Sequence, residues 1–173
     1  MDNINEKAKK VRLLLLDVDG VLTDGRVTLG NYGDEIKTFD IRDGLGVVLL
    51  RRAGLKCAII TAKSSKIVKI RAKQLCIDKI YENHYKLKSL ESIKRRFKVK
   101  AEEICFIGDD LIDAPILKRA GLAIAVPGAV SEAKAVAHYI TEKKGGRGAV
   151  REVCEIILKA QGKWGDITKR YLE

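Results

Sequence analysis

The sequence predicts an α/β fold in which a parallel central sheet is covered by helices on both faces. Two observations support this prediction. Short apolar runs that are typical of buried strands alternate with helical patterns along most of the 173 residues. Polar residues also follow several of these runs, at the place where open parallel sheets bind their ligands. A chain of this length is expected to form one domain, and we assign residues 1–173 to it.

The strands are predicted where apolar residues run together, beginning with the leucines of RLLLLDV. The helices are predicted where apolar residues recur with the spacing of one helix face. The clear strands, followed by two weaker ones, occupy residues 12–18, 56–61, 104–108 and 122–126, then 79–82 and 137–141. The helices between them occupy residues 43–53, 64–75, 86–97, 111–119, 130–136 and 148–161.

Two segments depart from this alternation. Residues 26–40 contain two alternating runs joined by Gly-Asn-Tyr-Gly-Asp, and this pattern predicts a β-hairpin. Residues 162–173 follow the last helix, and we expect a polar tail with no core of its own.

The composition is that of a globular protein, with 46% hydrophobic and 33% charged residues. No apolar run approaches the ~20 residues of a membrane-spanning helix, and the polar amino terminus lacks the apolar stretch of a secretory signal. We therefore expect a cytoplasmic protein that does not contact membranes. The cysteines lie far apart among apolar residues, so we expect buried reduced thiols rather than disulfides or a metal site at Cys57, Cys76, Cys105 and Cys154.

The net charge of +11 raises the question of nucleic-acid binding. The basic residues are spread along the whole chain among 23 acidic ones, aromatic residues make up 5%, and no nucleic-acid-binding motif is present. A solvated basic surface is the favoured interpretation, and a small anionic substrate also suits this charge. We predict no nucleic-acid partner.

Carboxylates gather at the end of the first predicted strand, where Asp17, Asp19 and Asp24 lie close together. Such a group of like charges costs several kcal/mol unless a cation compensates it. With two histidines and no thiolate pattern, oxygen ligands and Mg²⁺ are favoured over zinc. We predict that Asp17 and Asp109 hold this ion. The alternative for Asp19, Asp24 and Asp110 is a capping role, which does not explain Asp17 at the end of a leucine run.

The D-x-D spacing of Asp17 and Asp19 suits phosphoryl transfer through an aspartate. One carboxylate attacks phosphorus, and the second protonates the leaving alcohol and later activates water. Gly20 lets the backbone turn away directly after this pair. We therefore expect Asp17 to act as the nucleophile and Asp19 as the general acid and base.

Four motifs occur in the order and at the positions found in the haloacid dehalogenase superfamily of phosphohydrolases, which this chain resembles. The motifs are DVDGVLTDG, Thr61, Lys86 and GDDLIDAP at 108–115. The resemblance implies a Rossmann-like three-layer fold and an aspartyl-phosphate formed on Asp17. It also implies that the backbone carbonyl of Asp19 binds the metal ion.

The same resemblance implies roles for the later motifs. Thr61 would hydrogen-bond the transferring phosphoryl group, and Lys86 would neutralise the charge on the nucleophile and the phosphate. Asp109 would bind Mg²⁺, while Asp110 and Asp113 would orient the ligands around the ion. For Lys86 taken alone, the alternative is a solvated lysine at a helix start.

The spacing of the motifs leaves no room for the cap domain that larger members carry, so the hairpin stands in its place. The chain resembles the 3-deoxy-D-manno-octulosonate 8-phosphate phosphatases in lacking a cap domain. It also shares with them the motifs F-x-x-R-D-G-L-G and G-G-x-G-A-x-R-E. That family implies lipopolysaccharide precursor synthesis, a small sugar-acid phosphate as substrate, and a homotetramer whose subunits close one another's sites. Its substrate-contacting positions map onto Asp19, Asp40, Ile41, Arg42, Asp43, Gly44, Val48, Lys63, Arg71 and Lys86.

Arg71 has independent interest, because it lies on the apolar stripe of its predicted helix and a buried arginine needs a partner. A substrate anion is one such partner, and an ion pair with a nearby aspartate is the alternative. The chain departs from the family at 61-TAK-63, where T-G-R is usual, and at 83-NHYK-86, where a glycine usually precedes the lysine. Both departures lie where the sugar is expected, so they bear on the substrate more than on the reaction.

Two alternatives remain at this stage. The first is a phosphatase of a related nonulosonate 9-phosphate. The second is a phospho-acceptor receiver domain, which also uses an aspartate, Mg²⁺, a threonine and a lysine. Receiver domains lack the second aspartate of D-x-D and the later G-D-D run, and both are present here.

Overall fold

The fold is described from a computed structural model covering residues 2–173. Its centre is β1 (Leu13–Leu16), in which all four leucines are buried. β1 pairs in parallel with β4 (Lys56–Thr61) on one side and with β6 (Ile104–Gly108) on the other. The sheet is completed by β5 (Lys79–Glu82), β7 (Leu122–Ala125) and β8 (Tyr139–Ile140), in the order β5-β4-β1-β6-β7-β8. The predicted parallel sheet is confirmed.

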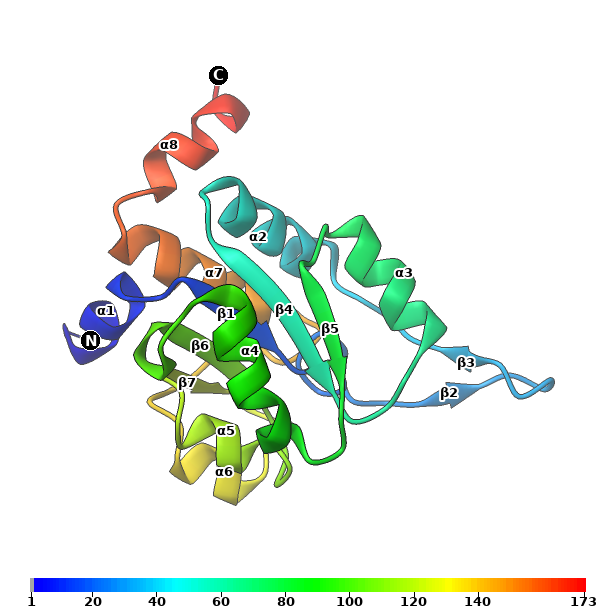
Figure 1. Ribbon diagram of the computed structural model, residues 1–173. Helices are drawn as coiled ribbons and strands as arrows, with labels where there is room; N and C mark the ends of the chain where they lie inside the picture. The colour runs from blue at the N-terminus through cyan, green and yellow to red at the C-terminus, as the bar shows by residue number, and fades with distance from the viewer. Residues whose placement is uncertain (1) are drawn as a thin grey trace.

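The chain runs outward from β1 through β4 to β5, then crosses back to β6 and continues to β8. Each connection between parallel strands is a right-handed crossover. Because the chain moves across the sheet first in one direction and then in the other, the connecting helices lie on opposite faces of the sheet. One face carries α1 (Asp2–Lys9), α2 (Ile41–Arg52), α3 (Lys66–Gln74) and α7 (Ala149–Ala160), as Figure 1 shows. The other face carries α4 (Leu90–Phe97), α5 (Ala114–Leu117) and α6 (Ser131–Ala135).

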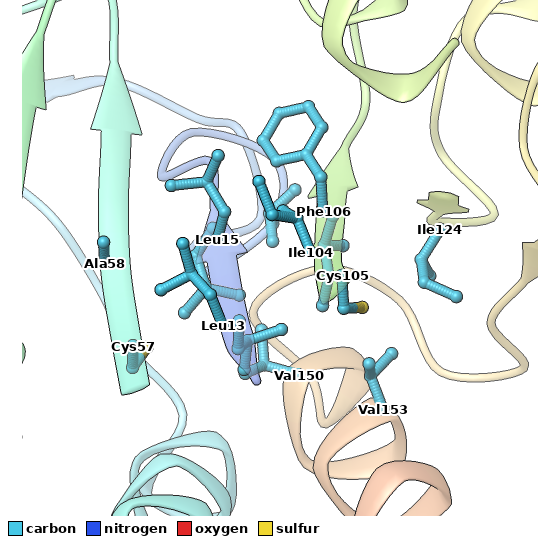
Figure 2. Close-up of a cluster of buried hydrophobic side chains, with 14 of the residues drawn as sticks. Leu13, Leu15, Cys57, Ala58, Ile104, Cys105, Phe106, Ile124, Val150 and Val153 are labelled. Atoms are coloured by element: carbon cyan, nitrogen blue, oxygen red, sulfur yellow. The ribbon is translucent and has the colours of Figure 1, made fainter. Parts of the chain in front are cut away.

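The core lies between the sheet and both helical layers. Side chains alternate along each strand, so Cys105 points toward Val150 and Val153 of α7 while the neighbouring Phe106 points to the opposite face (Figure 2). These four side chains are completely buried. Each buried side chain of this size contributes roughly 1.5–3 kcal/mol, and the sheet therefore provides a rigid base for the loops at its edge.

Residues 26–40 form the predicted hairpin, with β2 (Thr28–Leu29) paired antiparallel to β3 (Glu35–Ile36). The hairpin projects away from the sheet (Figure 1). The apolar side chains of its two strands and tip face solvent, with Leu29 68% exposed and Tyr32 100% exposed. It is therefore a small arm beside the sheet, in place of a cap domain.

Some helix predictions need correction. The predicted helix 111–119 is reduced to α5, because a turn occupies residues 111–113 and Asp113 stands at the N-cap position. The predicted helix 86–97 begins as a 3₁₀ turn over Lys86–Ser89 before α4. The amino-terminal helix α1, for which no element was predicted, packs beside α7.

The tail after α7 has no core of its own, as expected, but part of it is helical and packs against the main core. Residues 162–173 contain α8 (Trp164–Thr168) and a 3₁₀ turn over Lys169–Tyr171. Trp164 and Ile167 pack against the core, and the guanidinium carbon of Arg151 lies 5.3 Å from the centre of the Trp164 ring. The expectation for the cysteines holds for three of them, whereas Cys76 is exposed.

None of the helices within residues 2–173 combines the length and the apolar character needed to cross a membrane.

Candidate active site

The ends of β1 and β6 lie side by side, which brings Asp17 and Asp109 to one edge of the sheet. The backbone N–H of Asp17 still donates to the carbonyl oxygen of Ile107, at 3.0 Å, so Asp17 continues the β1 ladder. Asp17 is 5% exposed. Its burial and the charge of Asp113 raise the pKa of Asp17 well above the usual value for an aspartate. A carboxylate held in this position requires a positive partner.

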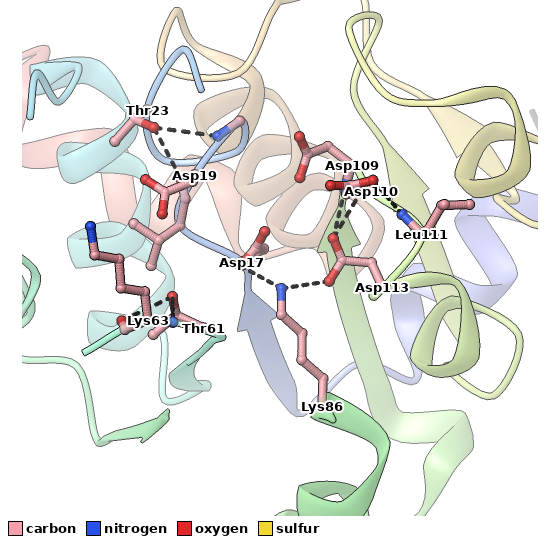
Figure 3. A network of polar contacts seen from close by, with 12 residues as sticks. Asp17, Asp19, Thr23, Thr61, Lys63, Lys86, Asp109, Asp110, Leu111 and Asp113 are labelled. Carbon is pink, nitrogen blue, oxygen red and sulfur yellow. Dashed lines mark hydrogen bonds and ion pairs between the residues drawn. The ribbon is translucent and has the colours of Figure 1, made fainter. Parts of the chain in front are cut away.

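Lys86 supplies that positive charge. Its ammonium nitrogen lies 2.6 Å from Oδ1 of Asp17 and 2.7 Å from Oδ1 of Asp113, and Figure 3 shows it between the two carboxylates. Burial alone lowers the pKa of Lys86, but the two carboxylates outweigh it and raise that pKa. Lys86 is 1% exposed, so the alternative of a solvated lysine does not hold.

Asp113 positions the other groups rather than facing the cavity. Its Oδ2 accepts from the backbone N–H groups of Asp109 and Asp110, at 3.0 Å and 3.1 Å, and its Oδ1 is bound to Lys86. A side chain at Gly108 would place its Cβ 2.6 Å from Cβ of Asp113, so glycine is required there. Asp113 thus fixes the loop after β6 and the lysine together.

Asp110 is exposed, and its Oδ1 accepts from the N–H of Leu111 at 2.7 Å. The predicted capping of a helix by Asp110 is corrected to the capping of a turn, because α5 begins only at Ala114. Asp24 is also exposed, and its Oδ1 accepts from the N–H of Arg26 at 3.2 Å.

A divalent cation fits the carboxylates at this edge. Oxygens of Asp17, Asp109 and Asp113 lie within 4.8 Å of one another. Since both oxygens of Asp113 are already hydrogen-bonded, Asp17 and Asp109 are the available ligands. Oδ1 of Asp109 is buried and has no hydrogen-bond partner within residues 2–173. Burial and the charge of Asp113 raise the pKa of Asp109 to about 6, and an all-oxygen donor set of this kind suits Mg²⁺.

The D-x-D loop is held by a residue that the sequence analysis did not identify. Oγ1 of Thr23, which is 1% exposed, accepts from the backbone N–H groups of Gly20 and Gly25, at 3.3 Å and 3.2 Å. Gly20 has φ +88°, and a Cβ there would lie 2.0 Å from Oδ2 of Asp109. The loop therefore turns back tightly against the second metal-ligand candidate.

Thr61 and Lys63 follow β4 on the other side of β1. Thr61 is buried, and its Oγ1 accepts from the N–H of Lys63 at 3.4 Å. Both residues line a cavity of about 200 Å³ together with Asp17, Asp19, Lys86 and Asp109. The structure thus brings together the residues predicted to carry phosphoryl transfer.

The predicted substrate positions at the start of α2 line a separate cavity of about 320 Å³, which includes Asp40, Ile41 and Arg42. Asp40 is the N-cap of α2, and its Oδ1 accepts from the N–H of Arg42 at 2.6 Å. Its Oδ2 lies 2.9 Å from Nη2 of Arg42. Hydrogen bonding by Arg42 lowers the pKa of Asp40.

Asp43 points away from both cavities. It is 1% exposed, and its carboxylate accepts from the backbone N–H groups of Gly148 and Arg151, at 3.2 Å and 2.7 Å, at the start of α7. Its burial raises its pKa to about 6. The Asp43 side chain is therefore used to join α2 to α7, and Val48 lies half-buried further along α2.

Arg71 is half-buried against the start of α2. Its Nη2 donates to the carbonyl oxygen of Asp40 at 3.3 Å, and its guanidinium lies 5.6 Å from the centre of the Phe39 ring. Gly44 makes room for it, because a Cβ there would lie 2.5 Å from Nη2. Within residues 2–173 Arg71 has no carboxylate ion pair, and its buried Nε lacks a hydrogen-bond partner. The predicted alternative of an ion pair with an aspartate is not found.

Lys37 is a second residue that the sequence analysis did not identify. It follows β3 in the hairpin, and its ammonium nitrogen lies 2.5 Å from Oδ1 of Asp19. A lysine in a hairpin is ordinarily a surface residue, so composition and spacing carry no signal of this contact.

The fold and the site define a haloacid dehalogenase-type hydrolase. The buried Asp17 follows the central strand, and Asp19 comes two residues later. Thr61, Lys86 and Asp109 line the same cavity. The sequence profile of the haloacid dehalogenase-like hydrolases matches residues 52–153. The 3-deoxy-D-manno-octulosonate 8-phosphate phosphatase KdsC of Yersinia pestis is 42% identical over 163 residues, which are 94% of this chain and 87% of that protein. The KdsC of Escherichia coli K12 is 42% identical over 91% of this chain and 84% of its own length.

A solved structure agrees. The crystal structure of 3-deoxy-D-manno-octulosonate 8-phosphate phosphatase from Moraxella catarrhalis, in complex with magnesium, phosphate and KDO, matches with a TM-score of 0.96. The identity is 41%, and the match covers 99% of each chain. The chain belongs to the family of 3-deoxy-D-manno-octulosonate 8-phosphate phosphatases within the haloacid dehalogenase-like hydrolases. It is a phosphoric monoester hydrolase, and the receiver-domain alternative is excluded.

Proposed function

We propose that this protein hydrolyses 3-deoxy-D-manno-octulosonate 8-phosphate to 3-deoxy-D-manno-octulosonate and phosphate, a step of lipopolysaccharide precursor synthesis. The observation that carries the proposal is the placement of Asp17, with Lys86 at 2.6 Å, in one cavity with Thr61 and Asp109. Family membership over nearly the whole chain supports the same substrate.

In the first step an oxygen of Asp17 attacks phosphorus, and the bond between phosphorus and the sugar oxygen breaks. Asp19 donates a proton to that oxygen, so the sugar leaves as an alcohol. Phosphate is then held as an aspartyl-phosphate on Asp17. In the second step Asp19 takes a proton from water, the water oxygen attacks phosphorus, and the release of phosphate restores the Asp17 carboxylate.

Lys86 and Thr61 act on the charge of the transferred group. The buried ammonium of Lys86 offsets negative charge on Asp17 and on the phosphoryl oxygens, in a site where water screens it little. The hydroxyl of Thr61 donates a hydrogen bond to a phosphoryl oxygen. Asp17, Asp109 and the backbone carbonyl of Asp19 would hold Mg²⁺, which supplies charge stabilisation at the phosphoryl oxygens when bound.

The sugar acid is proposed to contact the residues around the start of α2, together with Lys63 and Arg71. The unpartnered Nε of Arg71 and its position beside Asp40 support a role in binding a carboxylate. Since Asp43 is bonded to α7, it would support this surface without touching the sugar.

We also place the protein in the cytoplasm as a homotetramer of single-domain subunits. The support for assembly is the arm formed by the hairpin, whose apolar side chains face solvent, beside a site that no cap domain covers.

The test is phosphate release from a panel of sugar phosphates with Mg²⁺, including the octulosonate 8-phosphate and a nonulosonate 9-phosphate. Asp17→Asn serves as the blank, and Glu91→Gln, at an exposed carboxylate on α4 away from both cavities, serves as the control. We expect the octulosonate substrate to exceed the others at least tenfold in kcat/KM, or about 1.4 kcal/mol. A preference for the nonulosonate would assign the second candidate, and full activity of Asp17→Asn would refute the nucleophile.

A further inference from the structure

The hairpin brings charged side chains into contact with residues of the active site. Lys37 belongs to the projecting arm, yet its side chain is 2% exposed. Its ammonium nitrogen lies 2.5 Å from Oδ1 of Asp19 and 2.8 Å from Oε1 of Glu35. A lysine is rarely buried to this extent unless its charge is paired, and here two carboxylates pair it.

Glu35 and Lys37 are two residues apart on the same strand segment, so their side chains point to the same side. Glu35 also contacts the loop after β4, since its Oε2 lies 3.3 Å from the ammonium nitrogen of Lys63. The resulting network of ion pairs joins the D-x-D loop, the hairpin and the loop after β4. Its members are Asp19, Lys37, Glu35 and Lys63.

Asp19 itself is only loosely held by its own loop. Its side chain is 40% exposed, and Lys37 is the hydrogen-bonding partner that its carboxylate has within residues 2–173. Lys37 engages Oδ1, which leaves Oδ2 available for proton transfer. Glu35 offsets part of the positive charge of Lys37. The contact with Lys37 can therefore orient the Asp19 carboxylate while exerting less than the full effect of an unpaired positive charge on it.

We infer that Lys37 is a positioning residue for the proton-transfer step, which orients the Asp19 carboxylate toward the departing oxygen and is itself held by Glu35. This inference rests on the proposed function, because it requires Asp19 to be the general acid and base. It assigns a catalytic purpose to the hairpin within one subunit, in addition to any contact between subunits.

The inference predicts a dependence on the leaving group. A sugar alkoxide is a strong base and needs a proton from Asp19 as its bond to phosphorus breaks. A p-nitrophenolate is a much weaker base and departs without that proton. kcat/KM reports events up to the first irreversible step, so loss of Asp19 orientation lowers kcat/KM for the sugar phosphate and leaves it nearly unchanged for p-nitrophenyl phosphate.

The experiment compares both substrates for the wild type, Lys37→Met and Lys37→Arg, with Lys66→Met as a control at an exposed lysine. General acid–base catalysis commonly contributes 10²–10⁴-fold. We therefore expect Lys37→Met to reduce kcat/KM for the sugar phosphate at least tenfold more than for p-nitrophenyl phosphate. Lys37→Arg should recover part of this loss, because arginine keeps the charge and a donor.

Equal losses on the two substrates would mean that Lys37 merely supports the fold of the hairpin, and the inference would be wrong. An unchanged sugar-phosphate rate would also overturn it. If the wild type hydrolyses p-nitrophenyl phosphate but not the octulosonate substrate, the proposed substrate fails. The comparison is then made with any alkyl phosphate that the wild type accepts, so the two failures remain distinguishable.

Discussion

The ammonium nitrogen of Lys86 lies 2.6 Å from the Asp17 carboxylate and 2.7 Å from that of Asp113, and all three side chains are buried. One cation thus holds the end of β1 and the loop after β6 at a fixed separation. Because Asp113 also binds the backbone of Asp109, the same contact sets where the metal-ligand candidates stand.

Removal of this cation should cost both stability and activity. Lys86→Met leaves Asp17 and Asp113 buried without a compensating charge, and breaking a buried ion pair in this way costs roughly 3–5 kcal/mol. Urea unfolding in EDTA measures the loss in the free energy of unfolding, and phosphate release measures the rate, which should fall at least a hundredfold. Lys88→Met, at an exposed lysine of the same turn, is the control. An unchanged unfolding free energy would contradict the buried network.

The tight approach of Gly20 to Asp109 predicts a loss of metal binding on substitution. In Gly20→Ala the new Cβ meets Oδ2 of Asp109 at 2.0 Å, so the carboxylate must move. Gly33→Ala is a matched control, since Gly33 also has positive φ but a Cβ there has nothing within 4 Å. Mg²⁺ binding is measured as the rise of Tm with added Mg²⁺, because bound Mg²⁺ raises the free energy of unfolding by RT ln(1 + [L]/Kd). We expect this rise in the wild type and Gly33→Ala and its loss in Gly20→Ala; equal rises in both variants would refute the clash.

Asp43 predicts a particular pH dependence of stability. Burial raises its pKa in the folded protein to about 6, above the value of about 4 in the unfolded chain. The folded state therefore binds more protons at Asp43 between these values, and the contribution of Asp43 to the free energy of unfolding falls as pH rises from about 4 to about 6. The contribution is on the order of 2–3 kcal/mol.

Asp43→Asn should flatten this part of the profile. Denaturant unfolding of the wild type and of Asp43→Asn is measured across the pH range. The difference between the two profiles isolates the contribution of Asp43, because Asp17 and Asp109, whose pKa values are also raised, are present in both proteins. Parallel curves would show that Asp43 does not titrate in this window.

The exposed apolar arm predicts an assembly that a charge should disrupt. Leu29 is 68% exposed on the hairpin, and Leu29→Lys should convert the proposed tetramer to smaller species in light scattering. Ile70→Lys, at a residue that is 60% exposed on α3, provides a control away from the hairpin. A monomeric wild type at assay concentration would refute the assembly.

The fold class and the chemistry of the site could be predicted from sequence patterns. Parallel strands end at the same edge of a sheet, so the aspartates that follow the apolar runs at 12–18 and 104–108 were expected to lie close together. The buried leucines of β1 and the apolar run of β6 made those strands recognisable, and the D-x-D spacing made the reaction recognisable. These features depend on residues that are near one another in the chain.

The contacts between charged residues that lie far apart in the chain could not be predicted in this way, because they depend on how the chain packs. The sequence around Lys86 does not show that this lysine is buried between two carboxylates, and the sequence around Lys37 does not show its contact with Asp19. A lysine in a turn or a hairpin has the same sequence neighbours whether it faces water or a carboxylate. Asp43 was predicted to touch substrate and instead joins α2 to α7. Such pairings arise because the packed sheet and helices bring distant segments to within hydrogen-bond distance, where a buried charge must find a partner.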